Sequence, residues 1–168
     1  VGARGGAGIA YLDITTGALA TTEIQKPAGE LEQALQEELD RLHPAELLLP
    51  GEDDDQWATN GSGHAESVLP SARYHQLASN GNAQYPITTT PAHDWVLDTA
   101  RARLLKHFSA SSLKAYGCAR MPLAIRASGA LLAYGGVTNR SALDHMTRLV
   151  TYSTEQDSTR GPQPSRTL

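Results

Sequence analysis

Hydrophobic residues near the start of the chain gather in two short runs rich in β-branched and aliphatic side chains, residues 8–14 and 18–24. Thr15, Thr16 and Gly17 separate the two runs. Runs of this composition are typical of strands, and a glycine-containing turn between two of them predicts a β-hairpin.

Leucines recur at helical spacing across residues 30–42, at positions 31, 35, 39 and 42, and the acidic side chains lie mostly on other faces. This pattern predicts an amphipathic helix, which Pro44 ends. Residues 46–49 then form a short apolar run before Pro50 and Gly51, the pattern of a strand buried on both faces. The order of hairpin, helix and strand predicts a mixed α/β sheet.

The regular pattern breaks between residues 51 and 91. An acidic cluster lies at residues 53–55, and two polar stretches rich in Gly, Asn and Ser lie at residues 59–63 and 79–84. Such composition predicts mobile loops. Weak strand signals remain at residues 72–77 and 87–90.

Order returns in the second half of the chain, where Asp98 is a natural N-cap for a helix over residues 99–108. The helical period turns four apolar residues inward: Ala100, Leu104, Leu105 and Phe108. It leaves three residues outward: Ala102, Arg103 and Lys106.

A further helix is predicted to begin with Pro122 at its first position and to end at Gly135 and Gly136. Its apolar face carries Leu123, Ala127, Ala130, Leu131 and Tyr134. A final apolar run covers residues 143–152. We therefore expect one domain over residues 1–150, with a loop-rich insertion at about 51–90, and a disordered tail over residues 151–168.

The charge balance narrows the classes of partner. The formal net charge is −4 and the pI about 5.8, which argues against tight autonomous binding of nucleic acid. The single Cys118 can form no intrachain disulfide, which fits a reducing cytoplasm. We expect no membrane span and no export signal, because no apolar run approaches the required length.

Several segments, in this order, resemble the connector domain of the bacterial DNA mismatch-repair family MutS. They are residues 8–17, 41–50, 94–108, 113–117, 122–134 and 141–150. The resemblance covers roughly residues 8–153, with an interruption between 52 and 88. It implies an α/β fold of the RNase H-like kind, a mixed sheet with flanking helices, placed between the mismatch-reading domain and the ATPase core. It also implies contacts with neighbouring MutS domains and with a MutL-like protein.

Two motifs of that family are missing from this chain. Phe108 is followed by Ser109 and Ala110, so there is no Phe-x-Glu wedge, and no glycine precedes a lysine, so there is no phosphate loop. DNA and ATP are therefore expected to be bound only by domains outside this chain. We expect no cofactor and no catalysis.

An RNase H-like fold raises the alternative of a metal-dependent nuclease acting alone, which needs several converging carboxylates. Asp13 lies on the first strand, and the following helix offers Glu37 and Glu38, but no third ligand is evident. The competing interpretation makes Asp13 a hydrogen-bond acceptor at the strand end. The six histidines are scattered, and His64-Ala65-Glu66 lacks the paired cysteines of a deaminase, so no metal site is expected.

The polar face of the helix over residues 99–108 is the surface we expect to meet a partner. Arg101, Arg103, Lys106 and His107 make a local basic patch on an acidic chain. A plain solvated helix face is the alternative. The family resemblance favours docking of MutL there, with Ala102, Arg103 and Lys106 as the contact residues. A second, compatible role is mechanical, because Trp95, Leu104, Phe108 and Tyr116 could pack on the helix from Pro122 as a rigid core.

Overall fold

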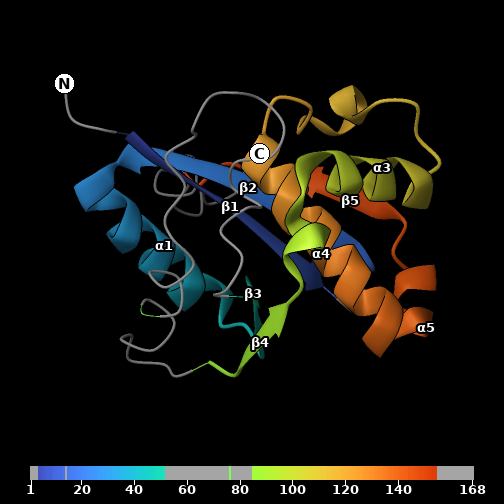
Figure 1. Ribbon diagram of the computed structural model, residues 1–168, viewed down its shortest axis with the longest axis horizontal. Helices are drawn as coiled ribbons and strands as arrows, with labels where there is room; N and C mark the ends of the chain where they lie inside the picture. The colour runs from blue at the N-terminus through green and yellow to red at the C-terminus, as the bar shows by residue number, and fades with distance from the viewer. Residues whose placement is uncertain (1–3, 14, 52–75, 77–84, 155–168) are drawn as a thin grey trace, which may run out of the picture.

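The computed structural model describes residues 4–13, 15–51, 76 and 85–154. The strands lie mostly in the first half of the described chain and the helices mostly in the second, with β5 returning at the end, as Figure 1 shows. In order they are β1 (Arg4–Asp13), β2 (Ala18–Pro27), α1 (Ala28–Leu42), β3 (Leu47–Pro50), β4 (Ile87–Thr90), η2 (Ala92–Trp95), α3 (Leu97–His107), η3 (Leu113–Tyr116), α4 (Pro122–Thr138), α5 (Arg140–Asp144) and β5 (Arg148–Thr151). No helix among these is long and apolar enough to cross a membrane.

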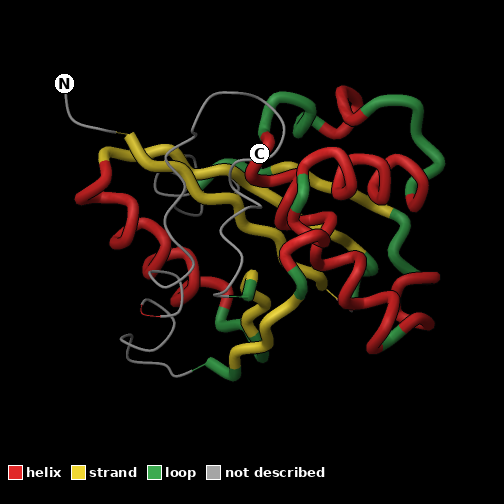
Figure 2. The backbone as a smooth tube through the Cα atoms, in the orientation of Figure 1, coloured by secondary structure: helices red, strands yellow, loops and turns green. Residues whose placement is uncertain are grey.

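The predicted hairpin is confirmed, and it forms the centre of the molecule. Strands β1 and β2 pair antiparallel along ten residues each, with Ala10 opposite Thr21. Strand β5 adds to the other edge of β2 in parallel, with Leu149 opposite Leu19. The result is a mixed sheet of order β1-β2-β5, traced in yellow in Figure 2. The mixed α/β class predicted from the sequence is therefore confirmed.

Alternation along the two long strands sends side chains to opposite faces of this sheet. On one face, Ala7 and Ile24 pack with Leu31 of α1. On the other face, Leu19 packs with Ile125 of α4 and with α3. The sheet is therefore covered by α1 on one side and by α4 and α3 on the other, so successive residues of β2 are buried on both faces.

Helix α4 lies at the centre of the second layer. It starts with Pro122 at its first turn, as predicted, but residues 123–130 are all buried, so no polar face exists there. The reason is that the sheet covers one side of α4 and α3 covers the other. Nor does the helix end at Gly135: it continues to Thr138, and Gly135 lies so close to Leu143 of α5 that a Cβ would approach its side chain to 3.0 Å.

Strand β3 differs most from its prediction. It pairs in parallel only with β4, where a weak strand was predicted, and the two form a separate two-stranded sheet. Residues 47–49 are half-buried, so β3 is not a strand buried on both faces. Of the strand predicted at residues 72–77 only Gln76 is described, and it is helical. The predicted loops at 59–63 and 79–84 and the tail beyond residue 154 lie outside the described residues.

The start of α3 also differs from its prediction. Asp98 is not the N-cap, because α3 begins at Leu97, and Val96 occupies the cap position without a side-chain hydrogen bond. The preceding turn η2 leads the chain into the helix, and Trp95 is fixed there by its indole Nε1, which donates to Thr90 Oγ1 at 2.8 Å. Asp98 instead lies in the first turn of α3, where its negative charge interacts favourably with the positive end of the helix dipole.

Candidate functional site

The three residues predicted to meet a partner all lie on α3, but they differ in their exposure to solvent. Ala102 and Lys106 are exposed, as predicted. Arg103 is half-buried: its guanidinium donates to Asp94 Oδ1 at 2.8 Å and to the Gly129 carbonyl at 3.0 Å. The prediction that Arg103 points outward is therefore wrong, because its side chain lies between η2, α3 and α4 and ties them together.

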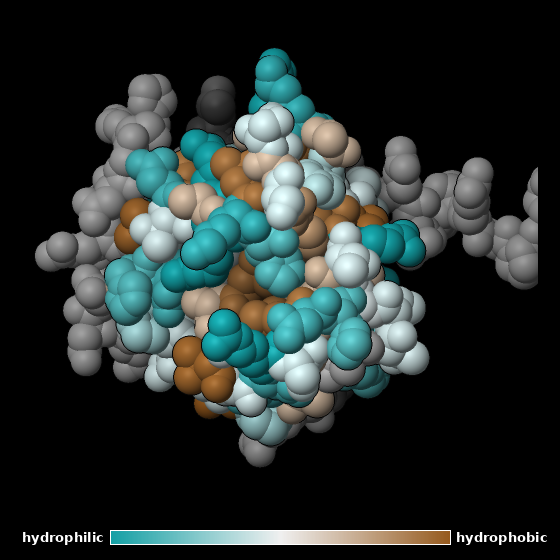
Figure 3. Space-filling model, turned by 90° about the vertical axis from the view of Figure 1, so that its right-hand side faces the viewer, coloured by the Kyte–Doolittle hydropathy of each residue, from teal (hydrophilic) through white to brown (hydrophobic). Residues whose placement is uncertain are grey.

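The remaining basic residues of α3 are also partly engaged. Arg101 lies 3.9 Å from Asp98 Oδ1, one turn away, and His107 Nε2 lies 2.9 Å from the Met146 carbonyl oxygen. Within the part of the chain that the structure describes, Lys106 has no ion pair. We call Ala102 and Lys106 together the α3 surface. Figure 3 views the side of the molecule that carries α3 and α5, where hydrophilic residues surround a small hollow with hydrophobic residues in it.

Asp13, the best candidate for metal chemistry, is a turn residue. Its Oδ1 accepts hydrogen bonds from the backbone N–H groups of Thr15 at 2.9 Å and Thr16 at 3.3 Å. The Thr16 side chain and then the Thr15 backbone lower the pKa of this carboxyl below its ordinary value by bonding to its charged form. The interpretation of Asp13 as a strand-end acceptor is confirmed.

Glu38, the second acidic candidate, is buried in a polar cluster that we call the Glu38 cluster. Its carboxylate accepts from Arg41, with Nε–Oε2 at 2.9 Å, and from the Tyr152 hydroxyl at 2.7 Å. Burial alone would raise the pKa of Glu38, but the bonds from Arg41 and Tyr152 outweigh it and the pKa is lowered. The same burial, and the bond to Glu38, raise the pKa of Tyr152. Arg41 also lies 5.4 Å from the centre of the Tyr152 ring.

This cluster was not predictable from local patterns, since Tyr152 and Glu38 are far apart in sequence. It links α1 to the chain directly after β5, where Tyr152 also meets Tyr11 of β1 edge to face at 5.7 Å. Glu38 is therefore committed to structure. Glu37, its neighbour, is exposed.

Glu23 performs a second structural task that the sequence did not indicate. From β2 it reaches the start of α4, where its Oε2 accepts from the N–H groups of Leu123 at 2.9 Å and Ala124 at 3.4 Å. These groups have no partner within their own helix, so a strand residue caps α4 from outside. Across the residues that the structure describes, no group of three or more His, Cys, Asp or Glu could hold a metal ion. His64 and Glu66 lie outside them.

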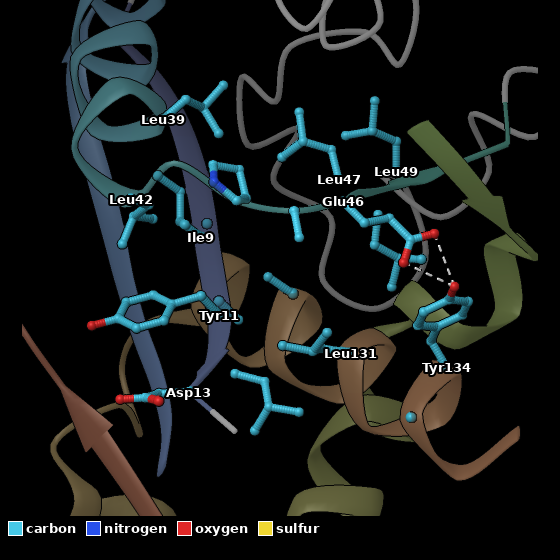
Figure 4. A pocket seen from close by; sticks show the side chains of 18 of the residues that line it. Ile9, Tyr11, Asp13, Leu39, Leu42, Glu46, Leu47, Leu49, Leu131 and Tyr134 are labelled. Atoms are coloured by element: carbon cyan, nitrogen blue, oxygen red, sulfur yellow. Dashed lines mark hydrogen bonds between the residues drawn. The ribbon is translucent and has the colours of Figure 1, made fainter. Parts of the chain in front are cut away.

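A large apolar pocket lies beside β1 and has a volume of about 730 Å³. Figure 4 shows β1 on one side and the segment of Glu46, Leu47 and Leu49 on the other. Side chains of α1 and α4 close the pocket from its two remaining sides. This pocket was not predictable from the sequence, because the apolar run of residues 46–49 predicts a strand inside the main sheet, whereas β3 lies in a separate one.

The family model described as MutS domain II matches residues 2–147, nearly the whole chain. The chain therefore belongs to the MutS domain II family, and the resemblance stated from its sequence is confirmed.

Three relatives give the scale of this match. The chain is 36% identical over 162 residues to the DNA mismatch repair protein MutS of Thermosynechococcus vestitus, which covers 96% of this chain and 17% of that protein. It is 34% identical over 153 residues to that of Desulfatibacillum aliphaticivorans, and this match covers 91% of this chain and 15% of that protein. It is 37% identical over 147 residues to a DNA mismatch repair protein MutS from Dehalococcoides mccartyi, and the match covers 88% of this chain and 14% of that protein. The chain thus spans about a sixth of the length of these relatives.

Proposed function

We propose that this chain is the connector domain of a MutS-like DNA mismatch-repair protein, a non-catalytic body that offers a docking surface to a MutL-like partner. It couples mismatch recognition to the ATPase core, both of which belong to other parts of the protein. DNA and ATP are bound there and not by this chain. The proposal includes an RNase H-like arrangement and a cytoplasmic location. A mixed sheet with helices on both faces supports that arrangement.

The observation that carries the docking role is the way α3 is held. Its inner side packs on α4, and Arg103 fixes it to Asp94 and to the Gly129 carbonyl. The outer side presents Ala102 and Lys106 to solvent. A helix held this firmly offers a surface that needs no rearrangement on binding, which lowers the entropic cost of docking.

The mechanical part of the proposal rests on the sheet. Strand β1, near the start of the described chain, and β5, near its end, flank the same strand β2. The Glu38 cluster then fastens Tyr152 to α1. A displacement applied at either end therefore acts on one packed body, because close-packed protein interiors deform little.

A binding titration tests the docking role. The chain is titrated with the MutL-like partner's N-terminal domain at low and moderate salt, together with Lys106→Glu. We expect salt-sensitive binding that the variant weakens, since an exposed cation steers encounter more than it supplies affinity. Lys114→Glu is the matched control, because Lys114 is an exposed lysine on η3, outside the α3 surface. Equal loss in both variants, or no binding at high micromolar concentration, would contradict the proposal.

The nuclease alternative has a separate test. Metal-dependent cleavage requires carboxylates that are free to bind cations, whereas Asp13 and Glu38 are engaged in hydrogen bonds. We therefore expect no cleavage of DNA or RNA on titration with Mg²⁺ or Mn²⁺. Cleavage that Asp13→Asn abolishes would refute the connector-only role.

A further inference from the structure

The end of α3 and the turn of the hairpin meet at the short segment between α5 and β5, residues 145–147. His107, the last residue of α3, lies with its imidazole Nε2 2.9 Å from the Met146 carbonyl oxygen. A carbonyl oxygen only accepts, so this bond requires the proton on Nε2. From the other side, Gly17 in the hairpin turn approaches His145 so closely that a Cβ would lie 2.5 Å from its carbonyl oxygen. The segment is therefore held from two sides.

This segment sets the position of β5. Directly after it the chain enters β5, where Arg148 lies opposite Ala18 at the start of β2. The Met146 side chain is buried in the same apolar cluster as Leu104 of α3 and Leu149 of β5. Figure 1 shows α3 and β5 on the same side of the molecule. Helix α3 is therefore connected to the start of β5 both through a main-chain carbonyl and through a shared core.

The polar part of this connection depends on a single side chain of α3. Within the described residues, His107 is the only α3 side chain that is hydrogen-bonded to residues 145–151. The other side-chain bond from β5 to a helix is at its far end, where Thr151 Oγ1 donates to the Tyr116 carbonyl of η3 at 2.6 Å. One substitution can therefore remove the bond between α3 and the start of β5 without touching the far end.

We propose that His107 is a positioning residue that couples the α3 surface to β5, so that a partner docked on α3 also stabilises the pairing of β5 with β2. The inference rests on the proposed docking through α3 and adds a consequence of that docking inside the domain. Helix ends open locally, and exchange of main-chain amides reports such opening. A partner that holds α3 closed keeps the His107 bond formed, and the segment before β5 stays in place.

Hydrogen exchange of the chain alone tests the bond. His107→Phe removes the donor but keeps a planar ring beside Phe108, which His107 meets edge to face at 4.7 Å. We expect roughly fivefold faster exchange of amides in β5, and a smaller change in β1. His107→Gln keeps a donor at similar reach and should restore most of the protection. An equal rise in β1 and β5, no rise in β5, or a Gln variant as fast as the Phe variant overturns the proposal.

A double-variant cycle distinguishes coupling from a merely structural contact. Ala102→Gly loosens α3 at an exposed position, because glycine is unfavourable inside a helix. We expect it to speed exchange in β5 roughly threefold in the parent and to have no effect in His107→Phe. Thr151→Val is the matched control, because it removes the bond at the far end of β5, and the effect of Ala102→Gly should persist there. An effect of the same size on all three backgrounds overturns the coupling.

The MutL-like partner's N-terminal domain separates this inference from the docking proposal. In the parent it should slow exchange in α3 and β5 together. In His107→Phe it should slow exchange in α3 and leave β5 unchanged, and equal protection of β5 in both proteins overturns the coupling. If the partner does not bind, the docking proposal fails, and the Ala102→Gly cycle still decides whether α3 and β5 are coupled.

Discussion

Replacing Gly129 by alanine probes the contact that holds the α3 surface in place. A Cβ at this position would lie 2.3 Å from Ala100 Cβ and 2.5 Å from Ala100 Cα. Carbon atoms in favourable contact are about 3.5–4.0 Å apart, so α3 would have to move away from α4 by more than an ångström. The Arg103 bond to the Gly129 carbonyl, 3.0 Å long, would be disturbed by the same movement.

The expected loss of stability follows from two opposed effects. Overpacking of an interior costs about 1–3 kcal/mol, and the upper end applies because the contact includes backbone of Ala100. Alanine is more favourable than glycine inside a helix by about 1 kcal/mol. The free energy of unfolding should therefore fall by about 2 kcal/mol. For a chain of this length that lowers the melting temperature by about 4–8 °C.

Urea unfolding followed by circular dichroism measures this difference, and Gly29→Ala is the matched control. Gly29 lies in α1, and a Cβ there would meet nothing within 4 Å. We expect the control to be neutral or stabilising by about 0.5–1 kcal/mol. The double variant with Ala100→Gly should recover only part of the loss, because Ala100 Cα remains close. A Gly129→Ala protein as stable as the parent would refute the close packing of α3 on α4.

Three further substitutions test the polar contacts. Glu23→Ala should destabilise the chain by about 1 kcal/mol in urea unfolding, because α4 loses its external cap, and Glu23→Gln should cost less; equal stability of Glu23→Ala and parent would contradict the cap. Tyr152→Phe should cost about 1–2 kcal/mol, because the buried Glu38 carboxylate loses a donor, and an unchanged urea midpoint would contradict that. Asp13 has a lowered pKa, so its stabilisation is present above the unfolded value near 3.8 and is lost as pH falls through the folded value. Asp13→Asn should therefore unfold at a lower urea concentration than the parent at pH 7, and the difference should shrink at pH 3. An equal difference in stability at both pH values would refute the lowered pKa.

The elements that the sequence predicted well are those whose patterns are local. The hairpin follows from two aliphatic runs around a glycine turn and α1 from leucine spacing, and both lie where predicted. β5 could not be recognised as a strand, because the four residues Arg148–Thr151 become one only by pairing with β2, far away in the chain. The apolar run before Pro50 was predicted as a central strand, but its pattern gives no information about which strand lies beside it. In the structure β3 pairs only with β4.

The candidate site was predictable in part. Helical period correctly placed Ala102 and Lys106 outward, because the inward face of α3 is set by Ala100 and Leu104. It misplaced Arg103, since a long side chain can turn back to acceptors on other elements, here Asp94 and the Gly129 carbonyl. The helical period of the sequence does not show where acceptors on other elements lie. The pocket beside β1 depends on strand pairing and was likewise beyond reach.

Hydrogen exchange of the chain with and without the MutL-like partner's N-terminal domain tests the connector role most directly. The partner should slow exchange of amides in α3, residues Leu97–His107, and leave α1, Ala28–Leu42, unchanged. Lys106→Glu should weaken that protection. Protection confined to other elements, or no change at partner concentrations that saturate the parent protein, would contradict docking through α3.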